Sequence, residues 1–257
     1  MHPTLNIALR AARAAGNIIV RAMDRLDTIQ VTEKKANDFV TEIDKQAEQV
    51  IIETIRDAYP SHGILAEESG SHNGDDTVWI IDPIDGTSNY IHGFPHFAIS
   101  IGVQHKGRLE HGLIFDPVRQ ETFIASRGDG ARLNDRRIRV SKCVNFHGAL
   151  LGTGIPHSKK ELLPFYIKMF ETLMPLAAGI RRAGSAALDL AYVAAGRLDG
   201  FWELGLSPWD VAAGALIIQE AGGLVSDTGG GENYLHGGSI VAGNPKIFKL
   251  LLQTVNR

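Results

Sequence analysis

The chain has 257 residues, of which 44% are hydrophobic and 21% are charged, with a formal net charge of -3 at pH 7. This composition is typical of a globular protein with a large core, and the basic residues do not form the stripe expected of a nucleic-acid-binding protein. No run approaches the ~18 apolar residues of a membrane span, and no secretion signal is evident, so we expect a cytoplasmic protein. The single cysteine, Cys143, excludes an internal disulfide and a cysteine-based metal site.

The first half of the chain combines two helices with a run of strands. Apolar residues recur at helical spacing over 4–25, and a second helix over 41–59 follows a polar break at 34–38. The predicted strands are 63–66, 78–81, 97–104, 109–115 and 121–125. The last three predict an antiparallel meander, whereas the glycine-rich segment 69–76 predicts a mobile loop.

The second half alternates strands and helices, without an internal repeat or linker. The predicted strands are 149–152, 179–182, 201–204, 224–225 and 240–242. The predicted helices are 159–173, 185–195, 211–221 and 245–255. Because the strands outnumber those of one small sheet and the helices come in pairs, we expect an α/β fold of alternating sheet and helix layers. We expect a single domain over 1–257, made of two intimate lobes at about 1–145 and 146–257.

An acidic segment follows the buried strand Val78–Ile81. Asp82 and Asp85 are separated by a turn containing Pro83, which can aim both carboxylates at one point without contributing an N–H group. The carbonyl of Ile84 offers a third oxygen. This arrangement predicts a site for a hard cation at the end of the strand.

Gly86 and Thr87 continue this segment into a predicted short helix. The free N–H groups at such a helix start would face an anion. The alternative is that the segment is a surface turn in which Asp85 only caps the helix.

Three further acids, Glu67, Asp44 and Asp210, lie where a predicted element meets a loop. Each has a purely structural alternative. Glu67 could be a solvated surface residue, and the other two acids could complete capping boxes with Thr41 and Ser207.

These residues together predict metal-dependent phosphate chemistry. The acids that can act as one cluster are Glu67, Asp82, Asp85 and Asp210. Gathering them costs several kcal/mol unless cations neutralise them, and oxygen ligands select Mg²⁺. Two ions ~4 Å apart, bridged by Asp82, would clamp a phosphate and generate hydroxide. Thr87 would hydrogen-bond the attacking water, with Asp44 orienting it.

Three separated segments make the chain resemble the inositol monophosphatase family, most closely its bacterial SuhB-type branch. They are Leu65-Ala66-Glu67-Glu68-Ser69, Trp79-Ile80-Ile81-Asp82-Pro83-Ile84-Asp85-Gly86-Thr87-Ser88-Asn89-Tyr90, and Trp209-Asp210-Val211-Ala212-Ala213-Gly214 with Glu220-Ala221-Gly222-Gly223 following. The resemblance implies an αβαβα sandwich and a lithium-sensitive, Mg²⁺-dependent phosphatase of myo-inositol 1-phosphate and related polyol or sugar monophosphates. Fructose 1,6-bisphosphate and 3'-phosphoadenosine 5'-phosphate are the alternative substrates.

The resemblance also implies a role for each site residue. The implied metal ligands are Glu67, Asp82 and the Ile84 carbonyl for one Mg²⁺, Asp82, Asp85 and Asp210 for a second, and Glu67 for a third, weaker ion. The implied substrate contacts are the Gly86 and Thr87 amides to phosphate, and Asp85, Ala186 and Glu203 to the hydroxyls. The implied catalytic residues are Glu67 and the water-activating pair Thr87 and Asp44.

The chain departs from the family pattern at two places. Ser207 stands where animal members carry a histidine, and the lysine of the family's first mobile loop matches Lys34 or Lys35, with Lys34 preferred. Both substrate contacts therefore stay open.

A second functional class is an interaction protein. The resemblance to SuhB-type proteins implies a homodimer and a part in transcription antitermination on ribosomal RNA operons, with RNA polymerase machinery as the partner. Arg181-Arg182-Ala183-Gly184-Ser185 resembles the subunit-contact segment of those proteins. The structural alternative is an exposed arginine pair at a strand end.

Overall fold

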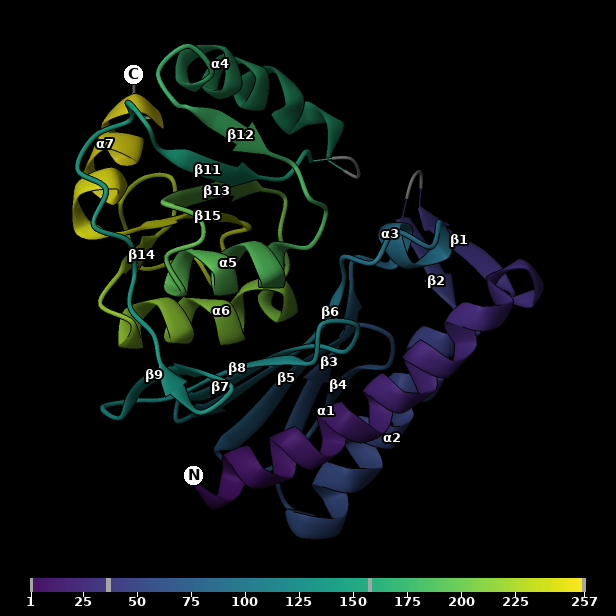
Figure 1. Ribbon diagram of the computed structural model, residues 1–257. Helices are drawn as coiled ribbons and strands as arrows, with labels where there is room; N and C mark the ends of the chain where they lie inside the picture. The colour runs from purple at the N-terminus through teal and green to yellow at the C-terminus, as the bar shows by residue number, and fades with distance from the viewer. Residues whose placement is uncertain (1, 36–37, 157–158, 256–257) are drawn as a thin grey trace.

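A computed structural model describes residues 2–35, 38–156 and 159–255. Its helices and sheets stack in the order α, β, α, β, α, as Figure 1 shows from the paired helices α1 and α2 to the opposite pair α4 and α7. The predicted layered sandwich is therefore confirmed.

The observed elements match the predicted order closely. The helices are α1 (Pro3–Ala22), α2 (Glu42–Ala58), α3 (Thr87–Ile91), α4 (Leu163–Leu173), α5 (Ala186–Ala194), α6 (Pro208–Glu220) and α7 (Pro245–Val255), with 3₁₀ turns η1 (Met23–Thr28) and η2 (Lys160–Leu162). The first strands are β1 (Val31–Lys35), β2 (Asp38–Thr41), β3 (Gly63–Ala66), β4 (Gly70–His72), β5 (Thr77–Asp85), β6 (Ala98–His105), β7 (Arg108–Asp116), β8 (Glu121–Ser126), β9 (Gly130–Leu133) and β10 (Arg136–Arg137). The remaining strands are β11 (Leu150–Thr153), β12 (Gly179–Arg181), β13 (Gly200–Leu204), β14 (Leu224–Ser226) and β15 (Ser239–Gly243).

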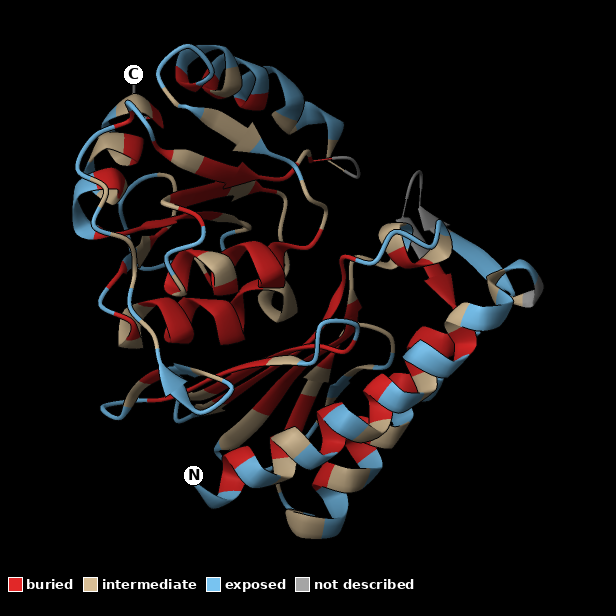
Figure 2. Cartoon of the chain, viewed as in Figure 1, coloured by how far each residue is buried: buried red, intermediate tan, exposed pale blue. Residues whose placement is uncertain are grey.

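The eight-stranded sheet has the order β10-β9-β8-β7-β6-β5-β3-β4, and α1 and α2 cover one of its faces. Both helices are amphipathic, and Figure 2 shows their buried stripes turned toward the sheet. Ile19 and Ile51 from the helices share one core with Trp79 and Ile81 of β5. This core fixes the strand that carries the acidic segment.

The helices α5 and α6 fill the space between the two sheets. Two glycines on the eight-stranded sheet permit the close approach of α6. A Cβ on Gly102 would lie 2.8 Å from the Ala212 Cβ, and a Cβ on Gly112 would lie 2.7 Å from the Ala213 carbonyl oxygen. The start of α6, where Asp210 lies, is therefore positioned by tight helix-on-sheet packing.

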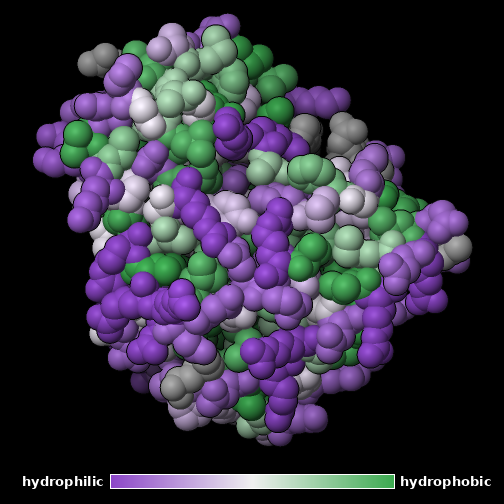
Figure 3. Space-filling model, viewed as in Figure 1, coloured by the Kyte–Doolittle hydropathy of each residue, from purple (hydrophilic) through white to green (hydrophobic). Residues whose placement is uncertain are grey.

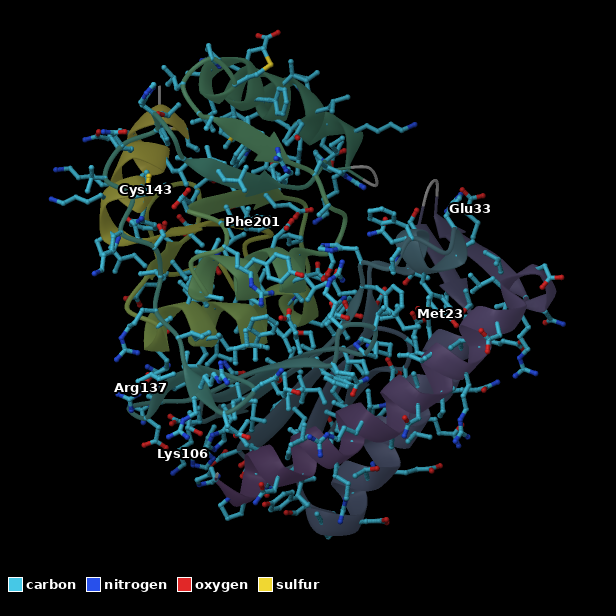
Figure 4. All side chains as sticks on the ribbon, viewed as in Figure 1. Met23, Glu33, Lys106, Arg137, Cys143 and Phe201 are labelled. Carbon is cyan, nitrogen blue, oxygen red and sulfur yellow. The ribbon has the colours of Figure 1, made fainter. Side chains whose placement is uncertain are left out.

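The five-stranded sheet has the order β12-β11-β13-β15-β14, with β11 parallel to both neighbours. One face packs on α5 and α6 through Phe201, which Figure 4 places in the middle of this half of the molecule. The other face carries Trp202, which packs with Ile247 and Leu251 of α7. Successive side chains of β13 point to opposite faces of the sheet and therefore pack against the helix layer on each side.

Two predictions about loops were wrong. Within the segment 34–38, predicted as a polar break, residues 34 and 35 belong to β1 and residue 38 belongs to β2, and these two strands pair in the antiparallel direction. The segment 69–76 is not simply a mobile loop, because β4 pairs with β3 at the sheet edge. β1, with the sequence Val-Thr-Glu-Lys-Lys, and β4, with the sequence Gly-Ser-His, are short and mostly polar, so hydrophobic periodicity gave no strand signal for them.

Two helix boundaries also differ from prediction. The first helix ends at Ala22, and a 3₁₀ turn replaces its predicted last residues. The helix predicted from 159 begins at Leu163, after η2. Pro164 explains the later start, because proline fits the first turn of a helix and not its interior.

The surface in Figure 3 is largely hydrophilic, with apolar residues in scattered groups. In the described parts of the chain, no helix combines the length and apolar character needed to cross a membrane.

Candidate functional site

A bulge in β5 brings two aspartates to the same side of the sheet. Asp82 is paired with Ser100 and Asp85 with Ala98, so three residue steps on β5 oppose two steps on β6. Residues three apart in a regular strand point to opposite faces, and the extra residue of a bulge reverses this. The acids were expected in a turn after the strand, and the structure places them inside it instead.

The carboxylates of Asp82, Asp85 and Asp210 converge. Ligand atoms from these three residues all lie within 4.8 Å of one another. Asp82 is only 2% exposed and accepts a hydrogen bond from the Ile84 amide at 2.9 Å. Burial raises the pKa of Asp82 well above its usual range, and the nearby Glu67 carboxyl raises it further. The alternative of an exposed surface turn is therefore wrong for this segment.

Asp85 also joins the eight-stranded sheet to α5. Its Oδ2 accepts hydrogen bonds from the Ser185 hydroxyl and the Ala187 amide, both at 2.6 Å. Burial raises the pKa of Asp85 to about 6, although these hydrogen bonds oppose the shift. The residue does not cap α3, whose N-cap is Gly86.

Asp210 completes the predicted capping box of α6 and lies in the cluster as well. Its Oδ2 accepts a hydrogen bond from the Ser207 amide at 2.7 Å. Burial raises the pKa of Asp210 well above its usual range, and Asp85 contributes next. The structural and functional interpretations of this acid are thus compatible.

The predicted water-activating pair is in direct contact. The Thr87 hydroxyl lies 2.9 Å from Oδ1 of Asp44 and 3.0 Å from the Ile84 carbonyl oxygen. Asp44 is fully buried, and its Oδ2 accepts from the Thr41 amide at 2.8 Å in the predicted capping box. Burial raises the pKa of Asp44, whereas its hydrogen bonds to the two threonines lower it.

Gly86 is required at the start of α3 for two reasons. Its φ of 104° lies in the left-handed region. A Cβ there would also lie 3.1 Å from the carbonyl oxygens of Gly184 and His96. The backbone that presents the Gly86 and Thr87 amides therefore depends on the absence of a side chain.

A cavity of about 500 Å³ opens beside the acidic cluster. Its polar lining residues include Glu67, Asp85, Lys159, Arg182, Ser185, Asp189, Glu203, Ser207 and Asp210, and Ala186 contributes an apolar contact. Burial raises the pKa of Glu203 well above its usual range, as do the nearby acids Asp210, Asp189 and Asp85, while Arg182 opposes the shift. Because five of these residues are acids and two are basic, an anionic ligand would need cations beside it, whereas the polar side chains can hydrogen-bond hydroxyl groups.

The structure also locates the residues whose roles the sequence left open. Ser207 lines the cavity as the N-cap of α6. The side chains of Lys34 and Lys35 lie outside the described part of the chain. Arg181 and Arg182 are both exposed, but only Arg182 lines the cavity.

Sequence reasoning missed Glu48, which holds the turn after β3. This glutamate is 2% exposed, and its two carboxylate oxygens accept from the amides of Glu68 and Ser69, each at 2.8 Å. Glu67 immediately precedes this turn. The sequence feature that could have identified Glu48 is its position as a charged residue four places after Asp44, on the buried face of α2.

If the acidic cluster binds Mg²⁺, as the sequence predicts, replacing Glu48 by glutamine should weaken that binding about tenfold. The amide turns one acceptor into a donor that faces a backbone N–H group, and residues behind the ligands orient them. Mg²⁺ titration of activity measures the effect. The control is Glu53→Gln, on the same helix but exposed and bonded to Gln49. Equal Mg²⁺ requirements for the two variants would contradict a positioning role for Glu48.

Comparison with known proteins identifies the family of the chain. The model of the inositol monophosphatase family matches residues 1–257. A relative from Pseudomonas aeruginosa described as Nus factor SuhB is 59% identical, over 99% of this chain and 96% of the relative. The crystal structure of extragenic suppressor protein suhB from Bartonella henselae matches with a TM-score of 0.97 at 41% identity, covering 100% of this chain and 99% of that one. An inositol monophosphatase structure from Anabaena matches with a TM-score of 0.89 at 40% identity, covering 98% and 95%. The chain belongs to the inositol monophosphatase family.

Proposed function

We propose that this protein is a cytoplasmic, Mg²⁺-dependent phosphomonoesterase that hydrolyses myo-inositol 1-phosphate and related polyol or sugar monophosphates. The observation that carries the proposal is the convergence of three aspartate carboxylates within 4.8 Å beside a polar cavity. Buried like charges at this separation need cations, and carboxylate oxygens favour a hard ion such as Mg²⁺. Family membership supports the same chemistry.

The proposed metal site uses oxygen donors from both halves of the chain. Two to three Mg²⁺ ions would be held by Glu67, Asp82, the Ile84 carbonyl, Asp85 and Asp210. Bound Mg²⁺ supplies Lewis acidity, which lowers the pKa of water and polarises phosphate oxygens.

The chain's own residues orient the water and the substrate. Thr87 donates its hydroxyl proton to Asp44 or the Ile84 carbonyl, so its oxygen is free to accept from the attacking water. The amides of Gly86 and Thr87 bind the phosphate, and Glu203 accepts from substrate hydroxyls. Asp85 and Ala186 complete the hydroxyl side of the cavity.

The test is phosphate release by the purified protein. Turnover of myo-inositol 1-phosphate should require Mg²⁺ and stop in excess chelator, whereas Ca²⁺ should bind and inhibit because it polarises water less. Li⁺ should also inhibit. Fructose 1,6-bisphosphate and 3'-phosphoadenosine 5'-phosphate are the comparison substrates, and a higher kcat/KM on either would replace the proposed substrate. Full activity in chelator, or equal activity with Ca²⁺, would refute the metal mechanism.

The second candidate function is a role as a homodimer in transcription antitermination. The 59% sequence identity to a relative described as a Nus factor, over nearly the full length of both chains, favours this role. The two roles can coexist, because the catalytic cluster lies inside a cavity and leaves the outer surface for partners. A cluster variant that loses phosphatase activity and still supports antitermination would separate the two roles.

The exposed residue Arg181, at the end of β12, tests the proposed subunit contact. Arg181→Glu should shift the protein toward monomer in sedimentation, because a reversed charge would lie unpaired in the contact. Arg137→Glu, at the exposed sheet edge, is the matched control. An unchanged sedimentation coefficient for Arg181→Glu would remove this residue from the contact.

A further inference from the structure

The end of β11 packs directly on the carboxylate of Glu203. Thr153 of β11 is in register with Trp202 of the parallel strand β13, so the next residue, Gly154, lies beside Glu203. A Cβ on Gly154 would come within 3.0 Å of three atoms of Glu203, namely its carboxylate carbon and both oxygens. Real Cβ atoms do not approach other atoms so closely. The carboxylate therefore occupies the space that a side chain at position 154 would take.

The requirement for glycine here is purely steric. Gly154 is not among the residues with positive φ, so a left-handed backbone is not the reason for glycine here. It is buried and lines the cavity.

A displaced Glu203 carboxylate would move into unfavourable surroundings. Asp85, Asp189 and Asp210 all act electrostatically on Glu203, and each would repel it. Movement into the cavity would take the carboxylate into the space that a bound substrate would fill. Among the groups that act on Glu203, Arg182 carries the opposite charge.

We propose that Gly154 is the positioning residue that holds the Glu203 carboxylate against the substrate hydroxyls, and that this contact selects phosphate esters of polyols over phosphate esters without hydroxyls. The inference rests on the proposed function and deepens it. A carboxylate held in place accepts hydrogen bonds with little reorganisation, and an analogue without hydroxyls leaves it unpaired.

A double-mutant cycle tests this inference with two substrates, myo-inositol 1-phosphate and p-nitrophenyl phosphate. Gly154→Ala should lower kcat/KM for inositol 1-phosphate about tenfold, with a much smaller change on p-nitrophenyl phosphate. In a Glu203→Ala background, where no carboxylate is present to be displaced, the same substitution should change kcat/KM by less than about twofold. Gly179→Ala on the neighbouring strand β12 is the control, because its added methyl would lie 3.0 Å from Arg181 Nη1 and 3.4 Å from Leu150 Cδ1 and would not overlap a carboxylate.

Equal losses on both substrates, or the same loss with and without the Glu203 carboxylate, would overturn the inference. If the unmodified protein hydrolyses neither substrate with Mg²⁺, the proposed function fails instead. The crystal structure of Gly154→Ala then still decides the positioning role, because a Glu203 carboxylate in its original place would refute it.

Discussion

Asp85→Asn and Asp210→Asn should each lower Mg²⁺-dependent kcat/KM by roughly a hundredfold or more, the loss seen when a charge-stabilising group leaves an active site. Asparagine keeps an oxygen for the hydrogen bonds that Asp85 receives from Ser185 and Ala187. It also preserves an acceptor for the Ser207 amide at the start of α6. The substitution therefore removes the charge while retaining the local structure.

The same variants should be at least as stable as the original protein when metal is absent, because repulsion within the cluster is relieved. The pKa of Asp85 is raised from 3.8 to about 6, so the folded protein holds this proton more tightly than the unfolded chain does. The metal-free free energy of unfolding should consequently fall as pH rises through this interval, and Asp85→Asn should flatten that dependence. Thermal melts in chelator between pH about 4 and about 7 measure this pH dependence of stability.

Asp75 provides a matched control for this prediction. It also accepts from a serine hydroxyl and a backbone amide, at 2.7 Å from Ser61 and 2.8 Å from Thr77, but it lies in an exposed turn. Asp75→Asn should keep full turnover. Cluster variants that melt lower yet retain normal activity would show that Asp85 and Asp210 only stabilise helix starts, at a cost of about 1 kcal/mol each.

Thr87→Val should lower kcat by roughly a hundredfold, the lower end of the range for lost acid–base assistance, with little change in the Mg²⁺ requirement. Valine has the shape of threonine but cannot hydrogen-bond the attacking water or Asp44. Single-turnover kinetics with saturating Mg²⁺ measure the chemical step directly.

Ser88→Ala, the next residue on α3, is the control because Ser88 is exposed. It should leave kcat unchanged. A loss for Thr87→Val that higher Mg²⁺ concentrations restore would instead show that Thr87 supports the metal site rather than the water.

The sequence predicted the layers well because buried helices and strands carry strong periodic signals. It identified the acids of the cluster because each lies where a predicted element meets a loop, as Asp82 follows the first part of β5 and Asp210 lies at the start of α6. It did not predict the bulge that turns Asp82 and Asp85 to one side, because register depends on the partner strand β6.

Two further residues show a different limit of prediction from sequence. Glu48 is distinguishable from an ordinary helical glutamate only by its place on a buried face. Gly154 gives no local signal, since its importance comes from Glu203, which is 49 positions later in the sequence and on another strand. Contacts between distant segments set both roles, and local patterns do not encode them.

The bond from Ser185 to Asp85 spans 100 positions of sequence, and Asp210 comes later still. During synthesis on the ribosome, a nascent chain therefore carries the first acids of the cluster long before the last one emerges. The inner face of the eight-stranded sheet, which α5 and α6 cover, is likewise exposed through that interval. Until α5 and α6 are made, this apolar face is prone to aggregation, and the proposed metal site is incomplete. The proposed phosphatase site can form only after α6, which covers the apolar face and carries Asp210, has been translated.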